Sequence, residues 1–148
     1  MAAKPKKSAG QKPRKKPRKK PESLRLRAAS AALTVANLQA SLAWYQDVLR
    51  FTLEETWEHG GKVMGASVKA GSVHLVLNQD DWARGRDRVK GEGFRLYLST
   101  TQDVDKVAGG IKARGGTLAS EPADMPWGTR SFTLVDPDGF KLTIATLA

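Results

Sequence analysis

Residues 33 to 51 read LTVANLQASLAWYQDVLRF, which predicts a short strand followed by a capped helix. In the predicted strand, residues 30 to 36, apolar side chains alternate with small polar ones, as expected for a strand with one buried face. Asn37 is a favoured residue for a helix N-cap. The apolar residues after it recur at helical spacing, at Leu38, Leu42, Tyr45, Val48 and Leu49. This stretch therefore predicts a strand and a helix that buries one side.

Three further strands are expected downstream of this helix. They span residues 52 to 58, 62 to 70 and 72 to 78. The first two are separated by the turn sequence His59-Gly60-Gly61, and Gly71 precedes the third. Glycine pairs and single glycines between apolar runs are typical of hairpin turns. The first half of the domain is therefore predicted as strand, helix and three strands.

The same order of elements recurs after a polar stretch, residues 79 to 92. A strand is expected over residues 94 to 99, and a Thr100-x-x-Asp103 capping box then opens a helix that ends at Gly115-Gly116. Strands are expected near residues 117 to 121, 129 to 135 and 140 to 146, the last two joined by Asp136-Pro137-Asp138-Gly139. The sequence thus predicts two modules, about 30–79 and 93–148.

Three segments together resemble a known family. They are LTVANLQASLAWYQDVLRF (33–51), DVDKVAGGIKARGG (103–116) and SFTLVDPDGFKLTI (131–144). In this order they are similar to motifs of the vicinal oxygen chelate superfamily, the group of glyoxalase I, bleomycin-resistance proteins and extradiol dioxygenases. The resemblance implies an α+β fold in which two βαβββ modules form a curved mixed sheet around a cavity, and it often implies a dimer. It does not identify one activity.

The resemblance also implies where a metal ion would be held in metal-dependent members. Those four positions fall on Ser30, His74, Arg95 and Thr143, with Phe94 or Leu96 as alternatives for the third. His74 alone has a good ligand side chain, whereas a divalent ion needs several converging His or carboxylate ligands. No metal or other cofactor is therefore predicted. A divalent metal would require atypical ligands, for which the candidates are Glu54, Glu92 and Glu121.

A metal-free cavity lined by these strands suits a flat or anionic small molecule, because it would combine aromatic, cationic and hydrogen-bonding groups. The predicted ligand-binding residues are Ser30, Trp57, His74, Arg95, Tyr97, Trp127, Lys141 and Thr143. Each has a structural alternative. His74 is as consistent with a hydrogen-bonded structural role, Arg95 with pairing to Glu92 or Asp124, and the aromatic residues with packing. The segment from Trp82 to Arg88 is interpreted as a solvated linker or a dimer contact.

The N-terminal segment differs in charge from the rest of the chain. Residues 1 to 27 contain 12 Lys and Arg and one acid, Glu22, whereas residues 28 to 148 contain 13 basic and 14 acidic residues. A Lys/Arg/Pro-rich segment with few apolar residues is expected to be a disordered tail. Such polycations bind phosphate backbones without reading sequence. The candidate nucleic-acid contacts are Lys12, Arg14, Lys15, Lys16, Arg18, Lys19 and Lys20, and a solubilising extension is the alternative.

Composition excludes several classes of site. The chain of 148 residues has no cysteine, so disulfides and thiolate chemistry are excluded. No apolar run reaches the roughly 18 to 20 residues of a membrane span, and the basic N-terminus has no apolar signal segment. One cytoplasmic domain, residues 28–148, is therefore expected behind the tail.

Three functions remain open from the sequence. The leading prediction is a metal-independent homodimer that sequesters or senses a small molecule. The second is an enzyme, a lyase, isomerase or oxygenase, in which His74 acts as general base with Arg95 or Tyr97. The third is nonspecific association with nucleic acid through the tail.

Overall fold

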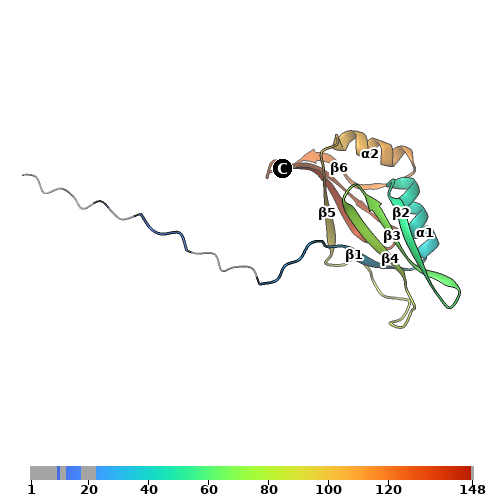
Figure 1. Ribbon diagram of the computed structural model, residues 1–148. Helices are drawn as coiled ribbons and strands as arrows, with labels where there is room; N and C mark the ends of the chain where they lie inside the picture. The colour runs from blue at the N-terminus through green and yellow to red at the C-terminus, as the bar shows by residue number, and fades with distance from the viewer. Residues whose placement is uncertain (1–9, 11–12, 18–22, 148) are drawn as a thin grey trace, which may run out of the picture.

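The computed structural model describes residues 10, 13–17 and 23–147. The first module contains β1 (Ala31–Val35), α1 (Leu38–Ala43), the π-helical segment η1 (Trp44–Val48), β2 (Thr52–His59), β3 (Lys62–Ala70) and β4 (Val73–Gln79). The second contains β5 (Arg95–Thr100), α2 (Val104–Ala113), β6 (Leu118–Asp124), β7 (Arg130–Val135) and β8 (Lys141–Thr146). The repeated order of strand, helix and three strands is therefore confirmed (Figure 1).

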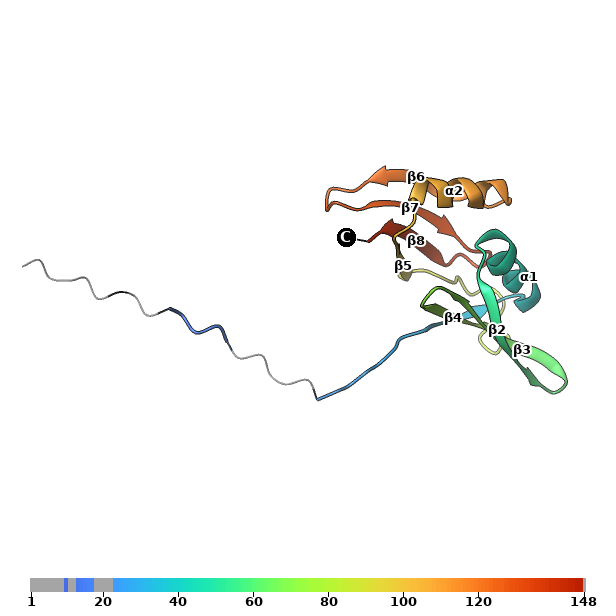
Figure 2. The same ribbon diagram turned by 45° about the horizontal axis from the view of Figure 1, so that its top comes forward.

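Each module forms its own four-stranded mixed sheet. The strand orders are β1-β4-β3-β2 and β5-β8-β7-β6, so β1 and β5 occupy equivalent edges (Figure 2). The pairs β1–β4 and β5–β8 are parallel, and the remaining pairs are antiparallel. A parallel pair needs a long crossover connection, which the helix and two strands between its members supply.

One contiguous hydrophobic core joins the two modules. In the first sheet the side chains at alternate positions, such as Leu33, Leu75 and Leu77, are at most 2% exposed. In the second, Phe132 and Leu142 are fully buried in the same cluster. Burying one such side chain stabilises the fold by about 1.5 to 3 kcal/mol. These side chains form one cluster with apolar residues of the helices, such as Leu38, Leu42 and Ile111.

The helix starts confirm one predicted cap and correct the other. Asn37 Oδ1 accepts the backbone N–H of Ala40 at 3.0 Å, as expected. At α2 the cap is Asp103, whose carboxylate accepts the N–H groups of Asp105 and Lys106. Thr100 is not the cap because it lies in β5, and its hydroxyl accepts from Gln102 instead.

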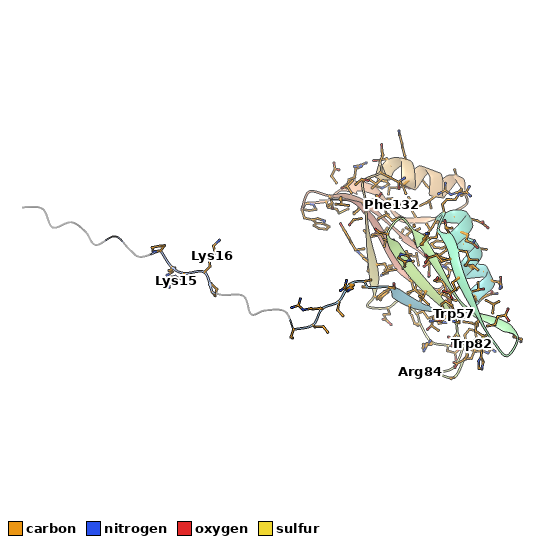
Figure 3. All side chains as sticks on the ribbon, in the orientation of Figure 1. Lys15, Lys16, Trp57, Trp82, Arg84 and Phe132 are labelled. Carbon is orange, nitrogen blue, oxygen red and sulfur yellow. The ribbon has the colours of Figure 1, made fainter. Side chains whose placement is uncertain are left out.

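The predicted tail falls mostly outside the described residues. Within 1–27 the structure describes residues 10, 13–17 and 23–27, which are exposed and have no helix or strand. Lys12, Arg18, Lys19 and Lys20 lie outside the described residues, whereas Arg14, Lys15 and Lys16 are described and exposed (Figure 3). Among the described residues, no helix has the length and apolar character needed to cross a membrane.

Candidate functional site

The open face of the first sheet carries the residues predicted to line a cavity. Along β4, burial alternates, so that His74 is exposed between the half-buried Val73 and the buried Leu75. Val76 and Asn78 share the face of His74 and pair with Ala32 and Thr34 of β1. This face therefore runs from His74 at one end of β4 to Asn78 and Thr34 at the other.

His74 makes its main contact with Glu54. Its Nδ1 lies 2.8 Å from Glu54 Oε2, and Lys69 Nζ lies 4.0 Å from the other carboxylate oxygen. The side chain of His74 is 47% exposed, so solvent or a ligand can reach it. A carboxylate on Nδ1 fixes the orientation of the ring and favours Nε2 as a proton acceptor. The contact thus suits either a structural histidine or a general base.

The open face of the second sheet is only partly exposed, because Ser131, Thr143 and Ala145 on it are at most 4% exposed. Arg95 and Lys141 are exposed, and the Tyr97 side chain is 50% exposed, with its hydroxyl 3.3 Å from Thr129 Oγ1. Neither predicted acidic partner of Arg95 pairs with it. Among the described residues, Asp124 pairs instead with Arg130.

Thr143 differs from its predicted role. It is 4% exposed, and its hydroxyl lies 2.9 Å from Thr133 Oγ1 on the neighbouring strand. The two hydroxyls use each other as partners, so Thr143 is a buried part of the sheet. In the strand register it lies between Tyr97 of β5 and Thr133 of β7, which flank it on both sides.

The remaining predicted residues lie apart from one another. Trp57, 38% exposed, covers Gly65 on the neighbouring strand, where an added Cβ would meet the indole ring. Trp127 is 67% exposed in the loop between β6 and β7, and Ser30 is exposed just before β1. The predicted residues are thus distributed over both sheets and the loop between β6 and β7, and they line neither the pocket of about 270 Å³ nor that of about 370 Å³.

The donor set at the four family metal positions does not fit a divalent ion. Arg95 is a cation, the Thr143 hydroxyl is hydrogen-bonded to that of Thr133, and Ser30 offers only a hydroxyl. His74 has one carboxylate beside it, and in the described part of the chain no three His, Asp or Glu side chains gather closely enough to hold a metal. An ion of this class needs several such ligands.

The linker between the modules forms a pocket that sequence reasoning missed. The pocket has a volume of about 270 Å³ and is lined by Thr34, Gln79, Asp80, Asp81, Ala83, Arg84 and Arg88. Figure 3 shows Trp82 and Arg84 on this loop, at the edge of the domain. The alternating charges of residues 79–92 suggested a solvated linker. The signal that could have found the pocket is the concentration of Arg residues beside Trp82 in a segment otherwise too polar for a core.

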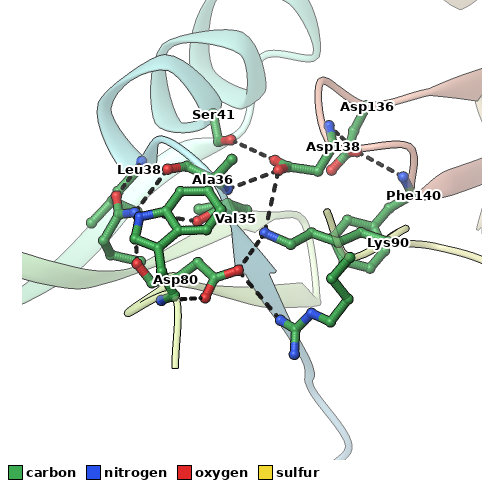
Figure 4. A network of polar contacts seen from close by, with 12 residues as sticks. Val35, Ala36, Leu38, Ser41, Asp80, Lys90, Asp136, Asp138 and Phe140 are labelled. Carbon is green, nitrogen blue, oxygen red and sulfur yellow. Dashed lines mark hydrogen bonds and ion pairs between the residues drawn. The ribbon is translucent and has the colours of Figure 1, made fainter. Parts of the chain in front are cut away.

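The same linker is fastened to the second module by buried charges (Figure 4). Lys90 Nζ lies 2.7 Å from Asp80 Oδ2 and 3.9 Å from Asp138 Oδ1, and its side chain is only 8% exposed. Within the described residues the ammonium makes no regular hydrogen bond, so the contact is an ion pair. The contact with Lys90 lowers the pKa of Asp80, and the Trp82 N–H adds to this effect. Asp80 therefore stays ionised at neutral pH.

Asp138 connects this ion pair to the first module. Its carboxylate accepts the N–H of Ala36 at 2.8 Å and the hydroxyl of Ser41 at 3.1 Å. The Asp136-to-Gly139 turn is thereby held against the end of β1 and the start of α1. We call the set Ala36, Ser41, Asp80, Lys90 and Asp138 the intermodule latch.

A second buried contact reinforces the latch. The fully buried Tyr45 hydroxyl donates to Asp136 Oδ2 at 2.8 Å, and Asp136 Oδ1 accepts the N–H groups of Asp138 and Phe140. Burial raises the pKa of Asp136 above its ordinary value, although these three donors oppose the shift. Burial and the Asp136 charge also raise the pKa of Tyr45, so the phenol stays protonated and donates.

A second pocket lies between the modules and has a volume of about 370 Å³. It carries no charged side chain and is lined by Leu49, Phe51, Ala70, Gly71, Ser72, Val73, Leu98, Ser99, Thr100, Thr101, Gln102, Val107, Ile144 and Leu147. The core cluster includes Phe51 and, at its margin, Ile144 and Val107, so this pocket opens on the helix side of the sheets.

Sequence comparison supports the architecture seen here. Residues 27–144 match the family described as the Glyoxalase/Bleomycin resistance protein/Dioxygenase superfamily. The chain belongs to this superfamily. A protein of Synechocystis sp. named "Probable lactoylglutathione lyase" is 30% identical over 118 residues, which cover 76% of this chain and 88% of that protein.

Solved structures of superfamily members have the same fold. A superfamily member from Sphaerobacter thermophilus aligns with a TM-score of 0.68 at 24% identity, covering 82% of this chain and 98% of the other. One from Nocardioides aligns with a TM-score of 0.66 at 22% identity, covering 84% and 85%. These superfamily relationships establish the fold and leave the reaction or ligand of this chain open.

Proposed function

We propose that this superfamily member binds a flat or anionic small molecule without a metal ion, as a homodimer that sequesters or senses its ligand in the cytoplasm. The observation that carries the proposal is the contact between His74 and Glu54. It pairs His74, which alone has a good metal-ligand side chain among the four family positions, with a single carboxylate. The other three positions carry one arginine and two hydroxyl side chains. Binding therefore has to rest on shape, stacking and charge.

The exposed faces supply the groups for such binding. Tyr97 and Trp127 are half to two-thirds exposed, and Trp57 extends the aromatic surface of the first sheet. Exposed aromatic side chains beside cationic ones favour flat or anionic ligands. The face of the first sheet is open in one chain, and the edge strands are β1 and β2 in the first sheet and β5 and β6 in the second. A homodimer would enclose a ligand more fully, and ligand sites usually bury most of their ligand.

The test compares metal content with ligand binding. Untagged protein is dialysed against Ni, Zn, Mn and Fe(II) salts and examined by elemental analysis, and its thermal stability is then screened with aromatic acids. Substoichiometric metal together with ligand-dependent stabilisation is expected. Near-stoichiometric metal that decreases in His74→Ala would refute the proposal. Sedimentation velocity with and without ligand tests the homodimer.

An enzyme is the first alternative, and the same contact favours it. Glu54 holds His74 through Nδ1, which leaves Nε2 to accept a proton. The Synechocystis relative is named as a probable lyase. Glyoxalase and dioxygenase assays distinguish this alternative, because turnover should then fall in both His74→Ala and Glu54→Gln. If neither substitution changes the turnover, the activity belongs to another site or to a contaminant.

Nucleic-acid association is the second alternative. Arg14, Lys15 and Lys16 are exposed and form no ion pair within the described residues. A polycation of this kind releases counterions from DNA, so affinity should fall steeply with salt, by a slope of about −0.9 per phosphate contacted. Fluorescence anisotropy with duplex DNA at several salt concentrations is the measurement. If the affinity for DNA survives deletion of residues 1–27, the tail is not part of the DNA interface.

A further inference from the structure

We propose that the linker pocket is an anion subsite, in which Arg84 and Arg88 hold the carboxylate of an aromatic acid whose ring lies on the open face of the first sheet. This inference rests on the proposed ligand-binding function and names the ligand class. It also places the charged end of the ligand away from Arg95 and Lys141, the cations that the sequence suggested.

Some polar groups that line the pocket already have partners within the protein, so they are not available to a ligand. Gln79 is fully engaged, because its amide donates to the carbonyls of Ala36 and Asp80 and its oxygen accepts the Leu38 N–H. Asp80 is engaged by Lys90 and by the Trp82 N–H.

The groups left over include two guanidinium groups that are only weakly paired. Within the described part of the chain, Arg84 has no ion-pair partner, and Arg88 has only a 3.4 Å contact to an Asp80 oxygen that Lys90 approaches more closely. Against these two guanidinium groups stands Asp81, one oxygen of which already accepts the Ala83 N–H. The lining thus carries two guanidinium groups and two carboxylates, and the carboxylate of Asp80 is already held 2.7 Å from Lys90 Nζ. A guanidinium group without an ion-pair partner, such as that of Arg84, can bind a carboxylate in bidentate geometry.

Size and position indicate a subsite for one end of a larger ligand. The volume of about 270 Å³ is slightly below the roughly 300 to 1,000 Å³ of sites for whole drug-sized ligands. Thr34, which lines the pocket, pairs with Asn78 on the face that also carries His74. Asn78 lies four positions along β4 from His74, about 13 Å at the usual rise per residue. An aromatic acid anchored in the pocket would therefore extend over Val76 toward His74.

The loop is already held in shape before any ligand arrives. Trp82 has a positive φ of 61°, unusual for this residue type, and Asp80 Oδ1 accepts its N–H at 2.9 Å. Arg86 lies 4.6 Å and Lys90 5.2 Å from the centre of the Trp82 ring. These contacts reduce the entropy that a ligand would lose in ordering the loop. They also place Arg86 on the indole ring, and it does not line the pocket.

Arg86 therefore provides a matched control for Arg84, since both are exposed arginines of one loop. Full-length wild type, Arg84→Gln and Arg86→Gln are titrated calorimetrically with 2-naphthoate and with the neutral 2-naphthalenemethanol. The tail is present in all three proteins, so its own attraction for anions cancels in the comparison. Wild type is expected to bind the acid at least about tenfold more tightly than the alcohol. Arg84→Gln should abolish that preference, and Arg86→Gln should keep it.

The outcomes separate this inference from the proposed function. If both probes bind and Arg84→Gln leaves the preference for the acid unchanged, the subsite is refuted while ligand binding stands. If neither probe binds, the proposed function fails for this ligand class, and inorganic phosphate alone then tests the pocket by amide NMR. Shifts at Thr34, Ala83 and Arg84 that are lost in Arg84→Gln would support an anion site, and their absence would refute it.

Discussion

The contact between Tyr45 and Asp136 gives a prediction whose size follows from the structure. Tyr45→Phe removes one hydroxyl, which lies 2.8 Å from the Asp136 carboxylate in a fully buried site. The ring and its edge contacts with Trp44 and Phe51 remain. The substitution therefore isolates a hydrogen bond to a charged group, which contributes about 1.5 to 3 kcal/mol. For a folded domain of this size the expected decrease in Tm is about 6 to 12 °C.

The pH dependence of the same substitution tests the mechanism. Burial raises the pKa of Asp136, so folding favours its protonated form and the stability that this group contributes is lost as pH rises through the folded pKa. The Tyr45 hydroxyl stabilises the ionised form, and its removal should therefore cost most near pH 7 and progressively less as pH falls toward 4. Thermal unfolding followed by circular dichroism measures both effects.

Tyr97→Phe is the matched control for this prediction. Its hydroxyl is 3.3 Å from Thr129, but the side chain is half exposed, so the loss should be below about 0.5 kcal/mol. Equal losses in the two variants, or a loss in Tyr45→Phe that is independent of pH, would contradict the assignment of Asp136 as a buried carboxylate held by Tyr45.

Three further predictions concern other contacts. Gly91→Ala should lower stability by about 2 kcal/mol or more in denaturant unfolding, because φ is +77° and an added Cβ would clash with the Gly139 carbonyl oxygen. Gly85→Ala, with positive φ but no atom within 4 Å of the added Cβ, is the control. Gly65→Ala should displace the Trp57 indole and shift tryptophan emission to longer wavelength, and an unchanged spectrum would place that ring elsewhere. The pKa of Asp105 is lowered by its hydrogen bonds with Arg130, so the stability it contributes is present above its ordinary pKa and lost as pH falls below about 4. Asp105→Asn should therefore have a lower Tm than wild type at pH 7, and the difference should vanish near pH 2.

Much of the fold was predictable because it depends on local patterns. The alternation along β1 and β4, the Asn37 cap and the Asp136-to-Gly139 turn each follow from a few neighbouring residues. The π-helical segment that begins at Trp44 was not predicted. Over so few residues, its spacing of apolar side chains differs from that of an α-helix by no more than one position.

The site was less predictable for two physical reasons. Glu54 lies at a register shift in β2, between Leu53 and Glu55, so strict alternation does not determine the face that it occupies. The latch unites Asp80, Lys90 and Asp138, charged residues from the linker and from a distant turn, whose spacing in sequence has no periodic signal.

The charged residues of the linker have different roles because they differ in burial. Lys90 is 8% exposed and is committed to holding Asp80 beside the Asp138 turn, whereas Arg88 is 36% exposed and Arg84 is exposed at the pocket. A charge buried between modules contributes to folding, because its removal leaves an opposite charge without its partner. A charge at the mouth of a pocket contributes little to folding and is available to a ligand. Lys90→Met should therefore lower the unfolding temperature, whereas Arg84→Gln should leave that temperature nearly unchanged and alter the preference for anions. If Arg84→Gln destabilised the fold as much as Lys90→Met, Arg84 would belong to the intermodule contacts, and the pocket would lose the cation on which its ligand class depends.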